Sequence, residues 1–232
     1  MLAFLLTLTS SKAQQKEITL EDIWGGAFRT QFMDVLHSMN NGKQYSVLDY
    51  NRTTNASSID VYEYKTGEKV KTLVTSTNLP EVDYFISYEF SEDESKVLLA
   101  TNLKQVYRHS SLGTYYVYDS KTKKATLLSE NQVQEPTFSP DGSKIAYGYN
   151  SNLYVKDLAS GITTQITSDG KKNEIINGIT DWVYEEEFAF VRAFDWNKNS
   201  DKIAFIRFDE TDVPEFSMDI YGEELYPSEN TF

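Results

Sequence analysis

One short phrase recurs along the chain and limits its fold more than any other feature. An aromatic residue is followed by a polar turn with Asp or Asn, and then by Lys and an apolar strand. The phrase begins at Phe90 (FSEDESKVLLA), Phe138 (FSPDGSKIAYG) and Trp196 (WNKNSDKIAFI), and a weaker copy begins at Met39 (MNNGKQYSVLD). The copies lie roughly 50 residues apart, which is typical of repeat architectures.

A second phrase follows most copies and completes the repeating unit. It occurs at 59–73, 115–128 and 153–166, each time as a strand, a turn rich in Lys, Thr, Ser and Gly, and another strand. This is a hairpin pattern, so each period contains four strands. Four-stranded units that repeat every ~40–50 residues are blades of a β-propeller. We therefore predict an all-β fold, a partial β-propeller with about four four-stranded blades; a β-sandwich is the alternative, but it needs no such regular spacing.

The composition agrees with strands and narrows the possible partners. Aromatic residues make up 14% of the chain, with 16 Tyr and 13 Phe, and they favour strands. The formal net charge of −13 repels nucleic acid and anionic membranes, so we expect neither as a partner. A cationic ligand would suit such a chain. The alternative is that the charge only keeps an exported protein soluble, and this explains the total charge better. There is no cysteine, no acidic loop has EF-hand spacing, and we predict no metal and no cofactor.

The first 13 residues, MLAFLLTLTSSKA, predict a signal peptide. An apolar run extends from Leu2 to Leu8, and Ser11 and Ala13 fit the −3 and −1 positions of a cleavage site. The run is too short to span a membrane, and no Lys or Arg precedes it. A buried N-terminal strand is the alternative. We expect an exported protein, in the periplasm or outside the cell, without a membrane span.

The segment between 166 and 196 departs from the strand pattern. Asp181 is a good N-cap, and the acidic residues after it favour the start of a helix. We predict a short helical insertion over WVYEEEFAF, at 182–190. Insertions between blade strands project from one face of a propeller, where binding sites tend to lie. Three apolar side chains are expected to fix the helix to the scaffold: Trp182, Val183 and Phe188.

Three consecutive glutamates lie on this predicted helix, at 185–187. Neighbouring carboxylates repel one another, and a cation between them relieves the repulsion. Adjacent helical residues point about 100° apart, so two of them can approach a compact ammonium from two sides. A solvated acidic face is the alternative, and the residues alone leave the two interpretations open. The aromatic side chains of Trp182, Tyr184 and Phe188 around the charges favour a binding site.

Three segments resemble one known family. GITDWVYEEEF at 178–188 closely resembles the double-glutamate segment of the dipeptidyl peptidase IV family, within the prolyl oligopeptidase superfamily. YRHS at 107–110, with YYVYD at 115–119, resembles the family segment that holds a substrate-binding arginine. FDETDVPEFSMDIYGEELYP, which begins at Phe208, resembles the stretch that follows the glutamate helix.

The resemblance implies a fold and a set of site residues. The family joins an eight-bladed N-terminal propeller to a C-terminal α/β-hydrolase domain, and it removes dipeptides from free N-termini when the penultimate residue is Pro or Ala. By motif position, Glu186 and Glu187 would bind the α-ammonium of the substrate. Arg108 would hydrogen-bond the substrate carbonyl and help to anchor the glutamates. Supporting roles would fall to Glu185, Trp182 and Tyr184.

The chain departs from the family pattern in its catalytic part. It contains no G-x-S-x-G sequence, and its two histidines, His37 and His109, lie in the repeats. We therefore expect no catalytic residue in this chain. We expect a segment at 14–35 before an incomplete propeller at 36–232, with the hydrolase domain absent.

The leading hypothesis is the N-terminal portion of an exported, bacterial-type serine exopeptidase, with a possible homodimer in the full-length protein. Its substrates would be peptides with a free N-terminus and a penultimate Pro or Ala. The alternative is a non-catalytic exported propeller that binds peptides or glycans, because no catalytic triad is present.

Overall fold

The computed structural model divides the chain into two compact units, Met1–Asp34 and Val35–Phe232. The residues that it describes are 17–30, 34–223, 226 and 228–231. The predicted signal peptide at 1–13 lies outside them. No helix within these described ranges is long and apolar enough to cross a membrane.

The described residues of the first unit contain one short helix, α1 (Leu20–Trp24). The helix begins at a capping box, in which the backbone N–H of Asp22 donates to Thr19 Oγ1 (3.0 Å) and the N–H of Thr19 donates to Asp22 Oδ2 (3.3 Å). Such reciprocal bonds satisfy two backbone groups that a helix start leaves unpaired. The apolar side chains in and around α1 are exposed: Ile18, Leu20, Ile23, Trp24 and Phe28.

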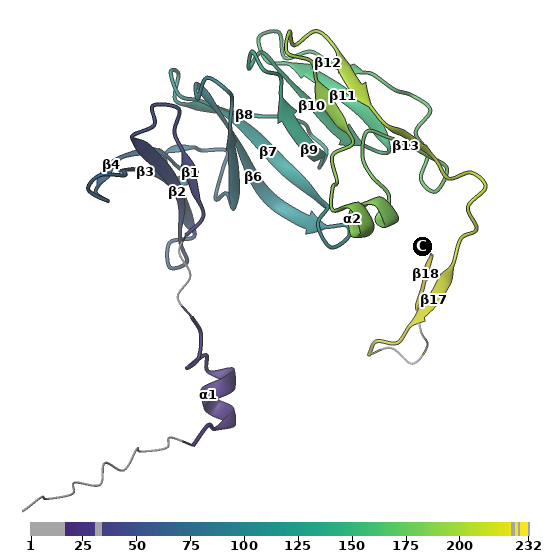
Figure 1. Cartoon of the computed structure of the whole chain (residues 1–232), viewed down its shortest axis with the longest axis horizontal. Coiled ribbons are helices and arrows are strands. Elements are labelled where there is room, and N and C mark those ends of the chain that lie inside the picture. The colour runs from purple at the N-terminus through teal and green to yellow at the C-terminus, as the bar shows by residue number, and fades with distance from the viewer. Residues whose placement is uncertain (1–16, 31–33, 224–225, 227, 232) are drawn as a thin grey trace, which may run out of the picture. The chain divides into compact units, whose positions relative to one another are not determined.

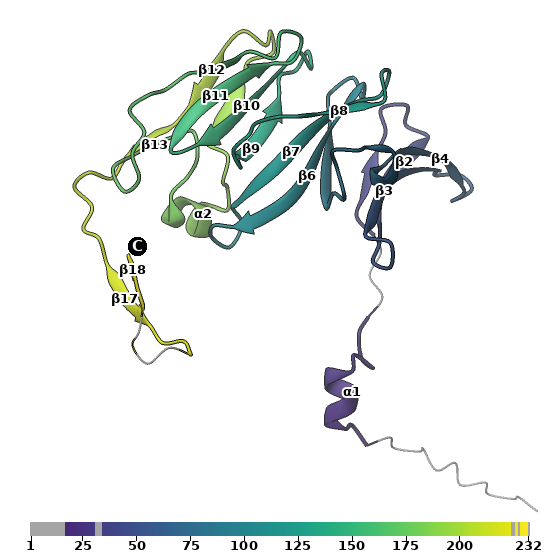
Figure 2. The ribbon, with the colours of Figure 1, turned by 180° about the vertical axis from the view of Figure 1, so that it is seen from behind.

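Three antiparallel four-stranded sheets form most of the second unit and follow one another in chain order (Figures 1 and 2). The first contains β1 (Leu36–Ser38), β2 (Gln44–Asn51), β3 (Ala56–Glu63) and β4 (Lys69–Thr75), which is followed by the 3-10 helix η1 (Ser76–Asn78). The second contains β5 (Ser87–Phe90), β6 (Lys96–Gln105), β7 (Ser111–Asp119) and β8 (Lys124–Leu127). The third contains β9 (Gln134–Phe138), β10 (Lys144–Tyr149), β11 (Asn152–Asp157) and β12 (Thr163–Gln165). Each sheet holds one sequence repeat, and the predicted all-β, partial β-propeller fold is confirmed.

The fourth repeat pairs its strands differently. The described strands form three two-stranded sheets: β13 (Ile175–Asn177) with β16 (Arg207–Asp209), β14 (Phe194–Trp196) with β15 (Ile203–Phe205), and β17 (Ser217–Ile220) with β18 (Ser228–Thr231). The helical insertion between β13 and β14 interrupts the meander. The pairs β13–β16 and β14–β15 remain joined through the backbone of Ile206. Its N–H donates to the Ala193 carbonyl (2.8 Å), and its carbonyl accepts from the Gly178 N–H (2.9 Å). The total number of propeller blades stays a prediction.

Apolar residues between successive sheets form the core. In β6, Val97 and Leu99 face the first sheet, whereas Leu98 between them faces the third. Both faces of this strand are buried, which explains its continuous apolar run. A third cluster lies between the third sheet and the fourth repeat: Ala146, Leu153, Ile179 and Phe194. Each inter-sheet layer therefore depends on the next repeat.

The recurring phrase forms the same closed turn in successive repeats. In the Phe138 copy, Ser139 Oγ and the Ser143 N–H both donate to Asp141 Oδ1, at 2.7 and 3.0 Å. These bonds hold the pKa of Asp141 well below its usual range. The turn also contacts the next copy, because the Asp141 N–H donates to Ser200 Oγ (3.0 Å) and Lys144 Nζ donates to the Ser200 carbonyl (3.0 Å). The phrase thus recurs because it joins neighbouring repeats.

Candidate functional site

The helix that carries the glutamates is α2 (Trp182–Phe188), and its prediction is confirmed (Figure 1). Asp181 Oδ1 accepts from the Tyr184 N–H (2.7 Å), as expected of an N-cap. The helix ends two residues earlier than predicted, because Ala189 adopts a left-handed conformation (φ 55°). Its seven residues are too few for a helix that persists on propensity alone, so side-chain contacts must hold it in place.

Glu185 provides the main attachment of α2 to the scaffold. Its side chain is 0% exposed, and Oε1 accepts hydrogen bonds from the backbone N–H groups of His109 and Ser110, the latter at 3.0 Å. Burial acts to raise the pKa of Glu185, but hydrogen bonds from Ser110 and from the His109 N–H outweigh it and lower the pKa. Glu185 is therefore a buried, ionised anchor. Its second oxygen, Oε2, is buried without a hydrogen-bond partner among the described residues.

The aromatic and aliphatic residues of α2 behave differently from the prediction. Trp182 is 55% exposed, Phe188 is 63% exposed and Val183 is also exposed, so the prediction that they fix the helix to the scaffold is wrong. Tyr184 makes the apolar contact instead, with its ring centroid 4.7 Å from that of the buried Phe208 in β16. A helix of two turns has only one inward face, and here the polar anchor Glu185 occupies it.

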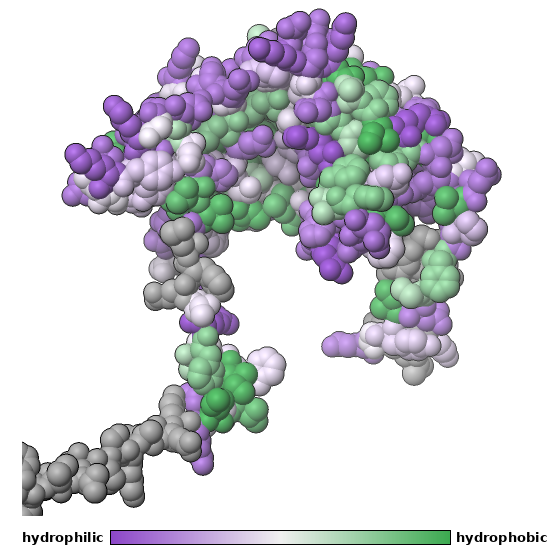
Figure 3. Space-filling model, viewed as in Figure 1, coloured by the Kyte–Doolittle hydropathy of each residue, from purple (hydrophilic) through white to green (hydrophobic). Residues whose placement is uncertain are grey.

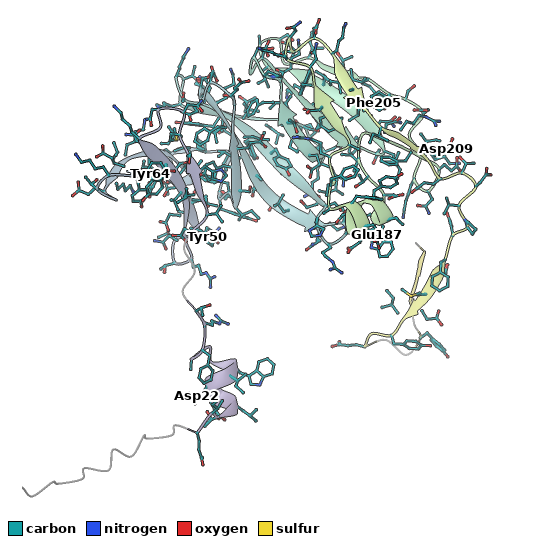
Figure 4. The ribbon with its side chains drawn as sticks, viewed as in Figure 1. Asp22, Tyr50, Tyr64, Glu187, Phe205 and Asp209 are labelled. Carbon is teal, nitrogen blue, oxygen red and sulfur yellow. The ribbon has the colours of Figure 1, made fainter. Side chains whose placement is uncertain are left out.

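Arg108 and Glu186 meet at the surface beside this anchor. Arg108 Nε lies 3.2 Å from Glu186 Oε1, and the Glu186 side chain is only 16% exposed. Glu187 is exposed on α2 (Figure 4), and its side chain makes no hydrogen bond or ion pair with any described residue. The structure thus brings the loop of Arg108 next to the three glutamates. The two segments are far apart in the sequence, since His109 and Glu185 are 76 positions apart.

The loop that presents Arg108 is ordered by its own hydrogen bonds. Gln105 Nε2 donates to the Arg108 carbonyl (2.6 Å), and Ser110 Oγ accepts from the Tyr107 N–H (3.2 Å). Ser110 is 2% exposed and also donates its N–H to Glu185. The sequence motif YRHS includes Ser110, but its anchoring role was missed, because nothing in the pattern shows which glutamate turns inward.

Further charged groups lie on the inner strands next to the site. Burial raises the pKa of Glu135 in β9, while Arg192 opposes the shift and the charge of Glu185 adds to it. Arg192 is held in place by a hydrogen bond from its Nη1 to Thr137 Oγ1 (3.0 Å). Figure 3 shows hydrophilic and apolar side chains next to each other around α2. The surroundings of α2 are therefore acidic, with aromatic neighbours.

This arrangement is suited to a compact cation with several N–H donors. One carboxylate oxygen of Glu186 contacts Arg108, and the rest of that carboxylate can still accept hydrogen bonds. Among the described residues, no donor contacts the carboxylate of Glu187, so both of its oxygens can accept. An ammonium group between the two would donate charge-assisted hydrogen bonds to their carboxylates, and such bonds are about twice as strong as neutral ones. Arg108, 71% exposed, has further N–H groups free for a carbonyl.

Comparison with known proteins places these residues in a family. Residues 91–232 match the family model described as "Dipeptidyl peptidase IV (DPP IV) N-terminal region". Prolyl endopeptidase FAP of Homo sapiens is 32% identical over 221 residues, which cover 94% of this chain and 28% of that protein. A probable dipeptidyl-aminopeptidase B of Chaetomium globosum is 30% identical over an alignment of 251 positions, gaps included, which covers 94% of this chain and 27% of that protein.

A solved structure of a dipeptidyl peptidase is also similar to this chain. The crystal structure of Porphyromonas gingivalis dipeptidyl peptidase 4 matches with a TM-score of 0.84 at 34% identity, over 94% of this chain and 31% of that one. The chain therefore spans less than a third of each of these proteins. With more than half of its residues matched by the family model and nearly all by the relatives, the chain belongs to the dipeptidyl peptidase IV family, as part of its N-terminal region.

Proposed function

We propose that this chain anchors the free N-terminus of peptide substrates in a dipeptidyl peptidase IV-like serine exopeptidase. Glu186 and Glu187 accept hydrogen bonds from the α-ammonium, and Arg108 donates to the substrate carbonyl. The proposal is supported by the Arg108–Glu186 ion pair, which lies next to Glu187 on a helix that Glu185 fixes from within. Among the described residues, Glu187 has no ion-pair partner. Trp182 and Tyr184 support the site from the same helix.

The chemistry follows from this anchoring. A fixed chain end sets the distance to the nucleophile, so the site acts as a ruler that selects the bond after the second residue. Such orientation supplies a large part of an enzyme's rate enhancement. The nucleophile and its acid–base partners belong to a hydrolase domain outside this chain, and the products are Xaa-Pro or Xaa-Ala dipeptides. We further propose that the protein is exported, to the periplasm or beyond the cell, and that the full-length protein forms homodimers.

The binding step is testable on this chain alone. Chemical shifts of the 232-residue chain are followed by NMR at pH 6.5 while glycyl-prolyl amide or N-acetyl-glycyl-prolyl amide is added. The α-amine is protonated at this pH because its usual pKa is about 7.7–8.0. We expect the free amine to shift signals of α2 and of the Arg108 loop, and the acetylated ligand to leave them unchanged. Equal effects of the two ligands would refute the ammonium site.

The catalytic part of the proposal needs the full-length protein that contains this chain. Its hydrolysis of a glycyl-prolyl chromogenic substrate is compared with that of the variant Glu187→Gln and of a control, Glu68→Gln, in a turn of the first sheet. We expect kcat/KM to fall by roughly two orders of magnitude in the first variant, because a charge-assisted bond is lost, and to stay unchanged in the control. An inactive full-length protein would contradict the peptidase assignment and favour a propeller that only binds.

A further inference from the structure

A cavity of about 600 Å³ is lined by residues of the first and second sheets and shares no residue with the proposed ammonium site. Its walls come from β3, β4 and η1 on one side, and from β7 and the turn between β7 and β8 on the other. Pockets of about 300–1,000 Å³ typically hold small molecules. The cavity is therefore large enough for a small organic ligand.

One part of the cavity wall is apolar. It is formed by Leu73 and Val74 in β4, Leu79 after η1, and Tyr118 in β7. All of these except Leu73 are buried and belong to the core between the two sheets. The Tyr118 hydroxyl already donates to the Leu73 carbonyl (3.3 Å), so it needs no ligand as a partner. This wall favours the apolar body of a ligand, because contact with it removes apolar surface from water.

Three polar side chains line the same cavity: Ser58, Asn78 and Lys123. None of them makes a side-chain hydrogen bond or an ion pair within the part of the chain that the structure describes. A hydroxyl, an amide and an ammonium can all donate hydrogen bonds, and together they suit a carboxylate. Asp60, which accepts from the lining residue Thr72 (2.7 Å), does not oppose such an anion, because Lys69 compensates its charge at 2.7 Å.

Lys123 occupies a turn position that glycine occupies in the neighbouring sheets. The turns after β3, β7 and β11 are closed alike, since the N–H groups of Gly67, Lys123 and Gly161 each donate to the last carbonyl of the preceding strand, at 2.8, 2.9 and 2.9 Å. Their φ angles are 70°, 61° and 73°. Such a left-handed backbone suits glycine and strains a residue with a Cβ. Strain of this kind is typical of functional positions, and here it places an ammonium at a cavity.

We propose that this cavity binds a small organic carboxylate with an apolar body, and that Lys123 pairs with the carboxylate. Ser58 and Asn78 donate to the same group, and the apolar body packs on the buried wall. Charge complementarity identifies the ligand class, because Lys123 is the charged side chain that lines the cavity. The site goes beyond the proposed function and does not depend on it.

An NMR titration of the 232-residue chain at pH 7 tests the proposal, with 4-phenylbutyrate as the probe and the neutral 4-phenylbutyramide as the comparison. We expect saturable shifts of the signals of Ser58, Asn78 and Lys123, with a Kd of about 2 mM or below, as for a weak ligand of about twelve non-hydrogen atoms. The neutral amide should bind at least about tenfold more weakly, because it cannot form the charge-assisted bond. Equal affinities, or no saturable shift up to about 20 mM, tenfold above that Kd, would overturn the proposal.

The variant Lys123→Gly separates ligand binding from folding. Glycine relieves the strained turn, so the urea midpoint should rise, while the affinity for 4-phenylbutyrate should fall at least about tenfold. Lys121→Ala is the matched control, because it removes the same charge from the same turn but does not line the cavity, and it keeps the N–H that donates to Asp119 (2.9 Å). Its affinity should stay within about twofold of the wild type, since solvent and salt screen an exposed charge. An unchanged affinity in Lys123→Gly, or equal losses in the two variants, would refute the carboxylate site.

Discussion

The backbone N–H of Ser110 donates a 3.0 Å hydrogen bond to the buried carboxylate of Glu185, across 75 residues of sequence. This contact joins the loop of Arg108 to the helix of Glu186 and Glu187. Glu185 therefore fixes the helix to the scaffold, and Glu186 and Glu187 remain available at the surface of the candidate site.

Replacing Glu185 should destabilise the fold. Glu185→Ala leaves the His109 and Ser110 N–H groups without their acceptor in a buried place, which costs about 3 kcal/mol for a broken charged contact. Urea unfolding measures the loss. Glu187→Ala, at an exposed position of the same helix, should change the free energy of unfolding by less than about 0.5 kcal/mol. Equal effects of the two substitutions would contradict the anchoring role.

Arg108→Lys tests whether ligand binding needs the planar guanidinium group or only a positive charge at this position. Lysine keeps the positive charge but cannot present the planar set of N–H donors that contacts Glu186 and remains free for a carbonyl. We expect the affinity for glycyl-prolyl amide to fall by about tenfold, because this factor corresponds to the free energy of one or two lost hydrogen bonds. The free energy of unfolding should barely change, because Arg108 is largely exposed. An unchanged affinity would exclude Arg108 from the site.

The repeated turns should make the fold sensitive to acid. Hydrogen bonds from Ser91 and Ser95 lower the pKa of Asp93 to about 2, and the equivalent bonds also lower that of Asp141. Because the folded pKa values are depressed, their stabilisation is present above the ordinary value of 3.8 and is lost as the pH falls towards 2. The urea midpoint should therefore drop between pH 5 and pH 2.5. Asp141→Asn should have a smaller drop than the wild type, and an equal drop would argue against the turn.

Two glycines with the same backbone angle offer a matched test of packing. Gly178, just before α2, and Gly161, in a surface turn, both have φ +73°. A Cβ on Gly178 would lie 2.6 Å from Leu153 Cδ2, whereas nothing lies within 4 Å of one on Gly161. Gly161→Ala should cost about 1 kcal/mol for the backbone strain alone, and Gly178→Ala about 2–3 kcal/mol more. Similar thermal midpoints for the two variants would contradict the close packing of Gly178 on Leu153.

The repeats predicted the architecture well because each copy combines a turn and an apolar strand that local chemistry explains. Asp141 shows why: its turn is closed by residues two positions away, so the pattern is readable in sequence. The helix α2 was predicted for the same reason, from its N-cap Asp181. The strand pairing of the fourth repeat was not, because it depends on contacts such as Gly178 with Ile206 that are distant in sequence.

The sequence named the residues of the candidate site, and these remain a prediction, but it did not give the contacts that hold them in place. Motif position identified Arg108, Glu186 and Glu187, and the structure brings Arg108 and Glu186 into contact. The inward turn of Glu185 could not be predicted, since three identical residues differ only in the face of the helix on which they lie. The same limit produced the wrong prediction for Trp182, because an exposed tryptophan and a buried one look alike in sequence.

The binding of a peptide's α-ammonium by Glu187 can be measured with a thermodynamic cycle. Affinities of glycyl-prolyl amide and its N-acetylated form are measured by NMR titration at pH 6.5, for the wild-type chain and for Glu187→Gln. We predict that the wild type prefers the free amine by at least about thirtyfold, as a charge-assisted contact of roughly 2 kcal/mol requires, and that Glu187→Gln loses most of this preference. A preference that is the same in both proteins would show that Glu187 does not bind the α-ammonium.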